Sequence, residues 1–173
     1  MRAWPALLLI VPLAAAAQTF GFGESKGGRK RVDEVKVTLP QYPEPENYLP
    51  FEVSATTPFA FFVDAKSVSV GADYVVRYSL IAKSAEGALN VSFEGLRCGE
   101  HQVRLYAVGQ SDKTWTEVRN SRWEPLRLDP RNAYRVVLYN DFFCPSTGYI
   151  ADVDEALRAL RSGGNPRSIT KGY

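Results

Sequence analysis

Few side chains in this sequence could carry out chemistry, and the best suited are one histidine and two cysteines. His101 follows the Gly99-Glu100 turn, close to Cys98, and the second cysteine is Cys144. A zinc site normally needs several His or Cys ligands. A cysteine hydrolase would pair a free thiol with His101, but neither cysteine lies in a Cys-Gly-Ser-Cys or Gln-Ala-Cys signature. We therefore expect no metal site and an exposed turn histidine.

Carboxylates are the remaining candidates for acid–base catalysis. Two carboxylates that met in space could cleave a glycosidic bond, and candidates near strand ends are Asp64, Asp73, Glu94 and Glu100. Solvated strand edges explain these residues equally well. The sequence has no Gly-x-Ser-x-Gly elbow and no phosphate-binding glycine loop, and Gly21-Phe-Gly lacks the strand and helix of a dinucleotide site. We expect no bound cofactor.

A polar cluster of Arg77, Glu94 and Arg97 is the one candidate site on the predicted sheet. A concave arrangement of these residues would favour an enzyme that acts through carboxylates or exposed tyrosines. Arg97 directly precedes Cys98, so a disulfide could hold it in place. A salt bridge at the sheet edge is the simpler interpretation.

The N-terminus has the layout of a secretory signal. Arg2 is followed by an apolar run from Ala3 to Leu13 and by four alanines, which predicts a signal peptide over 1–17 with cleavage after Ala17. The apolar run is too short to span a bilayer. The alternative is a buried N-terminal helix.

The two cysteines of an exported chain most simply pair with each other. Compartments beyond the membrane are oxidising, and an even count leaves no unpaired thiol. A Cys98–Cys144 disulfide would contribute roughly 4 kcal/mol by restricting the denatured chain. The alternative is a free catalytic or metal-binding thiol.

Composition predicts one domain between two less structured ends. Residues 18–39 are rich in Gly, Pro and charge and predict a flexible basic arm, 40–162 a single domain, and 163–173 a disordered tail. Val35, Val37 and Leu39 are expected to lie against the domain. The net charge of +2 falls to +1 when Arg2 leaves, which is too little to predict nucleic-acid binding.

The basic cluster in the arm is the most plausible interaction feature of the chain. Four cations on a flexible segment could reach phosphates at a membrane or polymer surface. The alternative is a solubilising tail. The cluster consists of Lys26, Arg29, Lys30 and Arg31.

Alternating apolar residues over 51–109 predict an antiparallel meander. On one strand Val76, Tyr78 and Leu80 should face inward while Arg77 and Ser79 face outward. A change of phase near Gly95 predicts a β-bulge at that glycine.

Helical patterns follow the meander. Asp129-Pro130 predicts the start of a helix over 131–143, with a strand over 134–139 as the alternative. Residues 152–161 predict a clear amphipathic helix. The expected fold class is therefore α+β, an antiparallel meander followed by one or two C-terminal helices.

Several segments resemble the cryptic neisserial protein 1-like family of proteobacterial envelope proteins. The resemblance covers about residues 40–161 and is most specific in the Phe-Glu-Gly-x-Arg-Cys core ending at Cys98 and in the later Phe-Cys-Pro. It implies export in a Gram-negative bacterium and strengthens the disulfide, but it implies no activity and no catalytic residues. The other matching segments are Phe51-Glu-Val-Ser-Ala, Phe61-Phe-Val-Asp, Ser69-Val-Gly-Ala-Asp, Arg77-Tyr, Tyr106-Ala-Val-Gly and Leu138-Tyr-Asn-Asp.

The sequence thus predicts a periplasmic or envelope binding module without catalytic activity. Its expected partner is an envelope protein or surface polymer, with no nucleic acid and no membrane span in the mature form. The alternative is an envelope hydrolase that uses carboxylates on the sheet.

Overall fold

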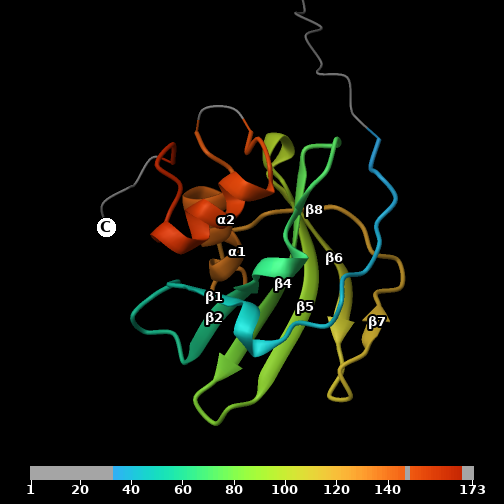
Figure 1. Ribbon diagram of the computed structural model, residues 1–173, viewed down its shortest axis with the longest axis vertical. Helices are drawn as coiled ribbons and strands as arrows, with labels where there is room; N and C mark the ends of the chain where they lie inside the picture. The colour runs from blue at the N-terminus through green and yellow to red at the C-terminus, as the bar shows by residue number, and fades with distance from the viewer. Residues whose placement is uncertain (1–32, 147–148, 169–173) are drawn as a thin grey trace, which may run out of the picture. The chain divides into compact units, whose positions relative to one another are not determined.

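In the computed structural model, the described residues are 33–146 and 149–168. They form an antiparallel sheet with helices packed on it (Figure 1). The predicted signal peptide with cleavage after Ala17, and the basic cluster that starts at Lys26, lie outside the described residues. No helix in the described ranges is long and apolar enough to cross a membrane.

The sheet is built from eight strands within the described residues, and every pairing is antiparallel. The main order is β1-β2-β4-β5-β6-β7, with β3 paired to β4 and β8 paired to β6. The predicted meander is confirmed. The strands are β1 (Tyr48–Phe51), β2 (Phe59–Asp64), β3 (Ser69–Val70), β4 (Val75–Ser84), β5 (Leu89–Arg97), β6 (Gln102–Gly109), β7 (Trp115–Glu117) and β8 (Glu124–Pro125).

The helices after the sheet follow their sequence signals closely. Helix α1 (Ala133–Val137) continues directly into the π-helical η4 (Leu138–Phe143), so the alternative strand over 134–139 is wrong. The helix begins later than predicted because Asp129 forms a turn in which its Oδ1 accepts the N–H groups of Arg131 at 2.9 Å and Asn132 at 3.1 Å.

Helix α2 (Val153–Ser162) confirms the predicted amphipathic helix over 152–161 and is capped at both ends. Asp152 accepts the N–H of Glu155 at 2.8 Å, and Gly163 ends the helix with a left-handed φ of 77°. Short 3₁₀ turns complete the secondary structure: η1 (Pro45–Asn47), η2 (Ala65–Ser67) and η3 (Cys98–Glu100).

Both faces of the sheet centre are covered. On one face Val76, Tyr78 and Leu96 join the core formed with α1, η4 and α2. On the other face lies a second buried cluster, formed by Phe93, Tyr106 and Ala107. The residues that pack on it are Val37, Leu39, Trp115 and Trp123. Burial on both faces explains why apolar residues occur on both sides of β5.

Two sequence expectations fail because the second face is also covered. Arg77 and Ser79, expected to face solvent, are 4% and 0% exposed. The expected bulge at Gly95 is absent, since this glycine pairs regularly with Arg77. The irregularity lies in the β5–β6 pairing, where the register shifts between Phe93 and Glu94 and leaves Tyr106 as the extra residue of β6.

The disulfide joins the sheet to the helical layer. Cys98, directly after β5, is bonded to Cys144, directly after η4, with their Cα atoms 5.2 Å apart. Tyr139 donates its hydroxyl to the carbonyl of Cys98 at 2.5 Å. The pairing expected from the sequence is confirmed, and the described residues contain no free cysteine.

The two ends of the described chain both pack on the domain. Residues 33–44, called here the extended segment, form neither helix nor strand and lead to η1 (blue to cyan in Figure 1). After α2, the side chain of Asn165 is buried and donates to the carbonyl of Phe142 at 3.3 Å and to Glu155 at 3.2 Å. Residues on both sides of the range 40–162, which the sequence predicts as the domain, therefore also contact the domain.

Candidate functional site

The three residues of the predicted polar cluster do not meet in one place. In the β4–β5 register Arg77 lies opposite Gly95, whereas Glu94 lies opposite Tyr78. Because side chains alternate between faces, Arg77 and Glu94 point to opposite sides of the sheet. Arg97 shares the face of Arg77. The structure thus brings two of the three residues to one face and separates them from Glu94.

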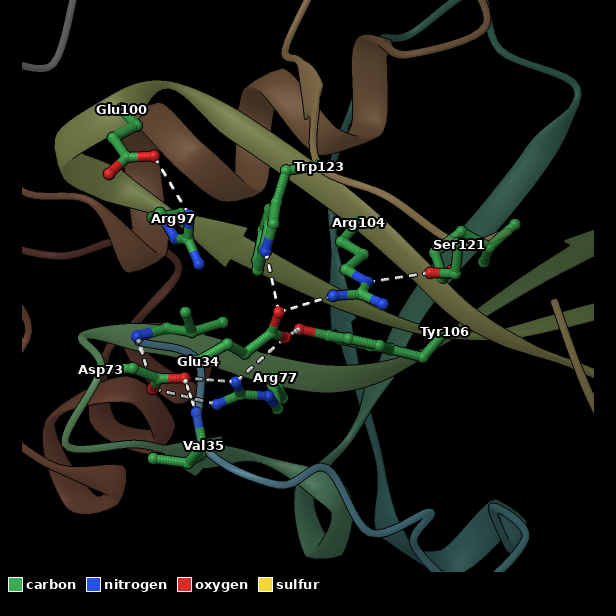
Figure 2. Close-up of polar contacts among 12 residues, drawn as sticks. Glu34, Val35, Asp73, Arg77, Arg97, Glu100, Arg104, Tyr106, Ser121 and Trp123 are labelled. Atoms are coloured by element: carbon green, nitrogen blue, oxygen red, sulfur yellow. Dashed lines mark hydrogen bonds and ion pairs between the residues drawn. The ribbon is translucent and has the colours of Figure 1, made fainter. Parts of the chain in front are cut away.

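On the face of Arg77, one carboxylate from the extended segment is the centre of a charged cluster (Figure 2). Glu34 Oε1 accepts from Tyr106 Oη at 2.5 Å and from Arg77 Nη2 at 3.4 Å. Its Oε2 accepts from Arg104 Nη1 at 2.6 Å and from Trp123 Nε1 at 3.0 Å. We call this set the Glu34 cluster: Glu34, Asp73, Arg77, Arg104, Tyr106 and Trp123.

Asp73, in the turn before β4, fixes Arg77 and also holds the extended segment. Its carboxylate accepts from Arg77 Nη1 at 3.2 Å and Nη2 at 2.5 Å, and from the backbone N–H of Val35 at 3.0 Å. The Asp73 side chain is fully buried. Gly71 makes room for this carboxylate, because a Cβ at that position would lie 2.2 Å from Asp73 Oδ1. The glycine in this turn therefore allows the ion pair between Asp73 and Arg77 to form.

The other donors are also fixed by their neighbours. Arg104 Nε donates to Ser121 Oγ at 2.9 Å, and that hydroxyl donates to the carbonyl of Leu105 at 2.5 Å. The Tyr106 ring lies over Gly95, where a Cβ would approach the ring to 2.9 Å. The Arg97 guanidinium lies 4.2 Å from the centre of the Trp123 ring. The donors thus have supports other than Glu34.

The charges of the cluster keep its titratable groups in one protonation state near neutral pH. Burial acts to raise the pKa of Glu34, but hydrogen bonds from Tyr106 and Trp123 and the charges of the two arginines outweigh it, so the pKa lies below 4.5. Burial also acts to raise the pKa of Asp73, but the Arg77 contacts and the backbone N–H groups of Val35 and Val75 outweigh it and lower that pKa. Burial, then the bond to Glu34, raises the pKa of Tyr106. None of these groups is suited to exchange protons at neutral pH.

The lowered pKa of Glu34 predicts an acid-dependent loss of stability. Glu34 in the folded protein titrates below its ordinary value of 4.5, so its contribution is complete above that pH and disappears as pH falls through the folded pKa. We expect the difference in unfolding free energy between wild type and Glu34→Gln to shrink as the pH is lowered below about 4.5. Denaturant titrations of both proteins at neutral and acidic pH measure it, and a difference that does not change with pH would contradict it.

Glu94 forms a second buried ion pair on the helical face. Its carboxylate accepts from Arg135 Nε and Nη2, both at 2.8 Å, and from Ser92 Oγ at 2.8 Å. The hydroxyls of Tyr78 and Tyr134 approach it at 3.4 and 3.3 Å. Burial acts to lower the pKa of Arg135, but the hydrogen bonds and charge of Glu94 outweigh burial and raise that pKa. This pair anchors α1 to the sheet.

The other residues that the sequence offered as candidates, Glu100, His101 and Asp64, lie outside the Glu34 cluster. Glu100 bonds Arg97 at 3.1 Å, and His101 is an exposed turn residue with a positive φ whose ring lies 4.9 Å from that of Tyr139. Asp64 caps η2 by accepting the N–H of Lys66 at 3.4 Å. Within 33–146 and 149–168, no group of three or more His, Cys, Asp or Glu side chains could hold a metal ion.

Sequence reasoning missed Glu34, Arg104, Tyr106 and Trp123 as parts of one site. The spacing of Arg104 and Tyr106 on a strand was a usable signal, because residues two apart share a face. No such signal marks Glu34, whose partners lie 43 to 89 residues away in the chain.

Taken together, the fold and site define a class: a disulfide-linked α+β module whose sheet holds helices on one face and an extended segment on the other. The chain belongs to the CNP1-like family, whose model matches residues 28–161. This match confirms the resemblance seen in the sequence and includes the whole Glu34 cluster and the disulfide. Neither a curated protein nor a solved structure matches the chain significantly.

Proposed function

We propose that this protein is an exported, non-catalytic binding module of the Gram-negative envelope. The observation that carries the proposal is the extended segment itself, which the sheet holds through side-chain donors and apolar contacts. Trp115 Nε1 donates to the carbonyl of Pro40 at 2.9 Å, and Tyr42 donates to the carbonyl of Gln110 at 3.2 Å. A sheet face that holds one extended polypeptide has the chemistry needed to hold another.

Export is supported by the N-terminal signal pattern and by the disulfide. Disulfides form and persist in oxidising compartments such as the periplasm, and Cys98 and Cys144 are paired. The basic cluster that includes Arg29 and Arg31 precedes the extended segment in the sequence and supports contact with anionic groups of the envelope. The proposed partner is an envelope protein or surface polymer.

A groove beside the Glu34 cluster is the proposed contact surface. It has a volume of about 470 Å³ and lies between the extended segment and the chain around β7. Arg104, Glu117 and Asn120 contribute polar groups to its wall, and Val37 and Val118 contribute apolar surface. Such a mixed lining suits a polar partner with apolar side groups.

One observation favours the alternative, an envelope hydrolase. Burial raises the pKa of Asp64, and this residue lines a pocket of about 370 Å³ together with Glu44 and Lys66. An acid of raised pKa near a second carboxylate is the arrangement that glycosidases use. The capping role of Asp64 at η2 accounts for its burial without catalysis, so binding remains the better supported function.

Binding and turnover can be separated by activity assays on purified mature protein together with crosslinking in cells. We expect no turnover across a broad panel of hydrolase substrates, and we expect an envelope component crosslinked in cells to be lost in Glu117→Arg, a change in the groove wall. Glu86→Arg, in the exposed turn after β4, is the matched control and should keep the component. Turnover that disappears in Asp64→Asn would overturn the proposal in favour of the hydrolase.

A further inference from the structure

We propose that the Glu34 cluster is a receptor for an extended acidic peptide, and that the chain's own residues 33–40 occupy this receptor until a partner segment displaces them. The inference rests on the proposed binding function and deepens it by naming the ligand class. The ligand is a segment with an Asp or Glu side chain followed by alternating apolar residues.

Four donor side chains converge on the carboxylate of Glu34. The two oxygens of Glu34 accept hydrogen bonds from the guanidinium of Arg77 on β4 and from the indole of Trp123. They also accept from the guanidinium of Arg104 and the phenol of Tyr106, both on β6. Arginine and fixed N–H donors are the groups that proteins use to recognise carboxylates. The geometry is therefore specific for a carboxylate, and an amide in its place would lose an ion pair with two arginines.

Contacts that do not involve the occupant hold Arg77, Arg104 and Trp123 in the receptor. Asp73 holds Arg77, Ser121 holds Arg104, and Arg97 stacks on Trp123. These contacts do not involve Glu34, so the donors stay in position when Glu34 leaves. Asp73 balances only one of the two arginines, which leaves a net positive charge in the emptied receptor. Preorganised donors of this kind lower the free-energy cost of binding.

The receptor contacts the backbone and the apolar side chains of the segment as well as its carboxylate. Asp73 accepts the N–H of Val35, the residue after Glu34. Farther along the segment, Val37 and Leu39 pack on the buried cluster that contains Phe93. Trp115 donates its indole N–H to the carbonyl of Pro40. The ligand is therefore expected to have apolar residues three and five positions after the acidic one, which matches the chain's own segment.

The extended segment can be displaced from the receptor. The extended segment has no strand pairing to the sheet, and Val35 is 39% exposed. The tether keeps the segment at a millimolar effective concentration. A partner must therefore make additional contacts, and the open groove lined by Glu117, Val118 and Asn120 offers the surface for them.

The test uses the full mature chain and a fluorescent acetylated peptide with the sequence of residues 33–42. We expect the peptide to bind Glu34→Gln about tenfold or more tightly than it binds wild type, because the competing carboxylate is gone. Adding Arg104→Gln to that variant should abolish the gain. A matched peptide with Gln at the Glu34 position should bind at least about tenfold more weakly.

A second measurement needs no variant. In wild-type protein, millimolar peptide should shift the indole N–H resonance of Trp123, and the Gln-containing peptide should not. Equal binding of the two peptides, equal affinity of wild type and Glu34→Gln, or no binding to Glu34→Gln would overturn the proposal. If Glu117→Arg still loses an envelope component in that case, only the peptide receptor is wrong and the binding function stands.

Discussion

Replacing Glu94 with glutamine is expected to lower the free energy of unfolding by about 3 kcal/mol. Glu94 is 1% exposed, and the Arg135 side chain bonded to it is 18% exposed. Glutamine keeps the size and one acceptor but leaves a largely buried guanidinium without a counter-charge. Breaking a buried ion pair from one side costs about 3–5 kcal/mol, and the partial exposure of Arg135 places this case at the lower end.

Two control variants separate the loss of charge from other effects. Glu44 pairs with Lys113 at 3.3 Å, and their side chains are 45% and 62% exposed, so Glu44→Gln should cost only about 0–1 kcal/mol. Adding Arg135→Met to Glu94→Gln removes the uncompensated charge and should restore much of the stability. Denaturant unfolding of the four proteins measures these differences. If Glu94→Gln costs no more than Glu44→Gln, the assigned role of the pair is wrong.

Removal of the disulfide is expected to have the second large effect, a loss of roughly 4 kcal/mol. The bond joins residues separated by 46 positions, and opening it returns that loop to the denatured ensemble. Cys98 and Cys144 are each 7% exposed, so the folded protein should resist mild reductants. The double variant Cys98→Ser/Cys144→Ser should unfold at lower denaturant concentration than wild type.

The same proteins show whether the cysteines are paired in their native compartment. Wild type should lose stability when reductant is added during unfolding, whereas the double variant should be unaffected by reductant. In protein purified from cells, both thiols should react with an alkylating agent only after reduction. Thiols that react in the native, unreduced protein would contradict the pairing and would reopen a free-cysteine activity.

The elements of this fold could be predicted because their signals are local. Alternation identified the strands, the amphipathic pattern over 152–161 identified α2, and two cysteines allowed one pairing. The interpretation of Arg77 failed for a physical reason: an arginine that alternates with apolar residues usually faces solvent, but here a second layer covers it. That layer is formed by chain segments outside the meander.

The candidate site could not be read from the sequence because it depends on register and on distant contacts. Arg77 and Glu94 lie on neighbouring strands, and only the pairing of Arg77 with Gly95 shows that they face opposite ways. Glu34 looks like any charged residue in a segment of mixed composition. Its role follows from donors brought together by β4, β6 and the chain around Trp123.

Hydrogen exchange at the backbone amide of Val35 measures whether Glu34 holds the extended segment on the sheet. This amide donates to Asp73, so we expect slow exchange in wild type at neutral pH. In Glu34→Gln the exchange should become fast at Val35 while the amides of β4 and β5 stay protected. Fast exchange of Val35 in wild type, or exchange that Glu34→Gln leaves unchanged, would mean that Glu34 does not hold the segment in place.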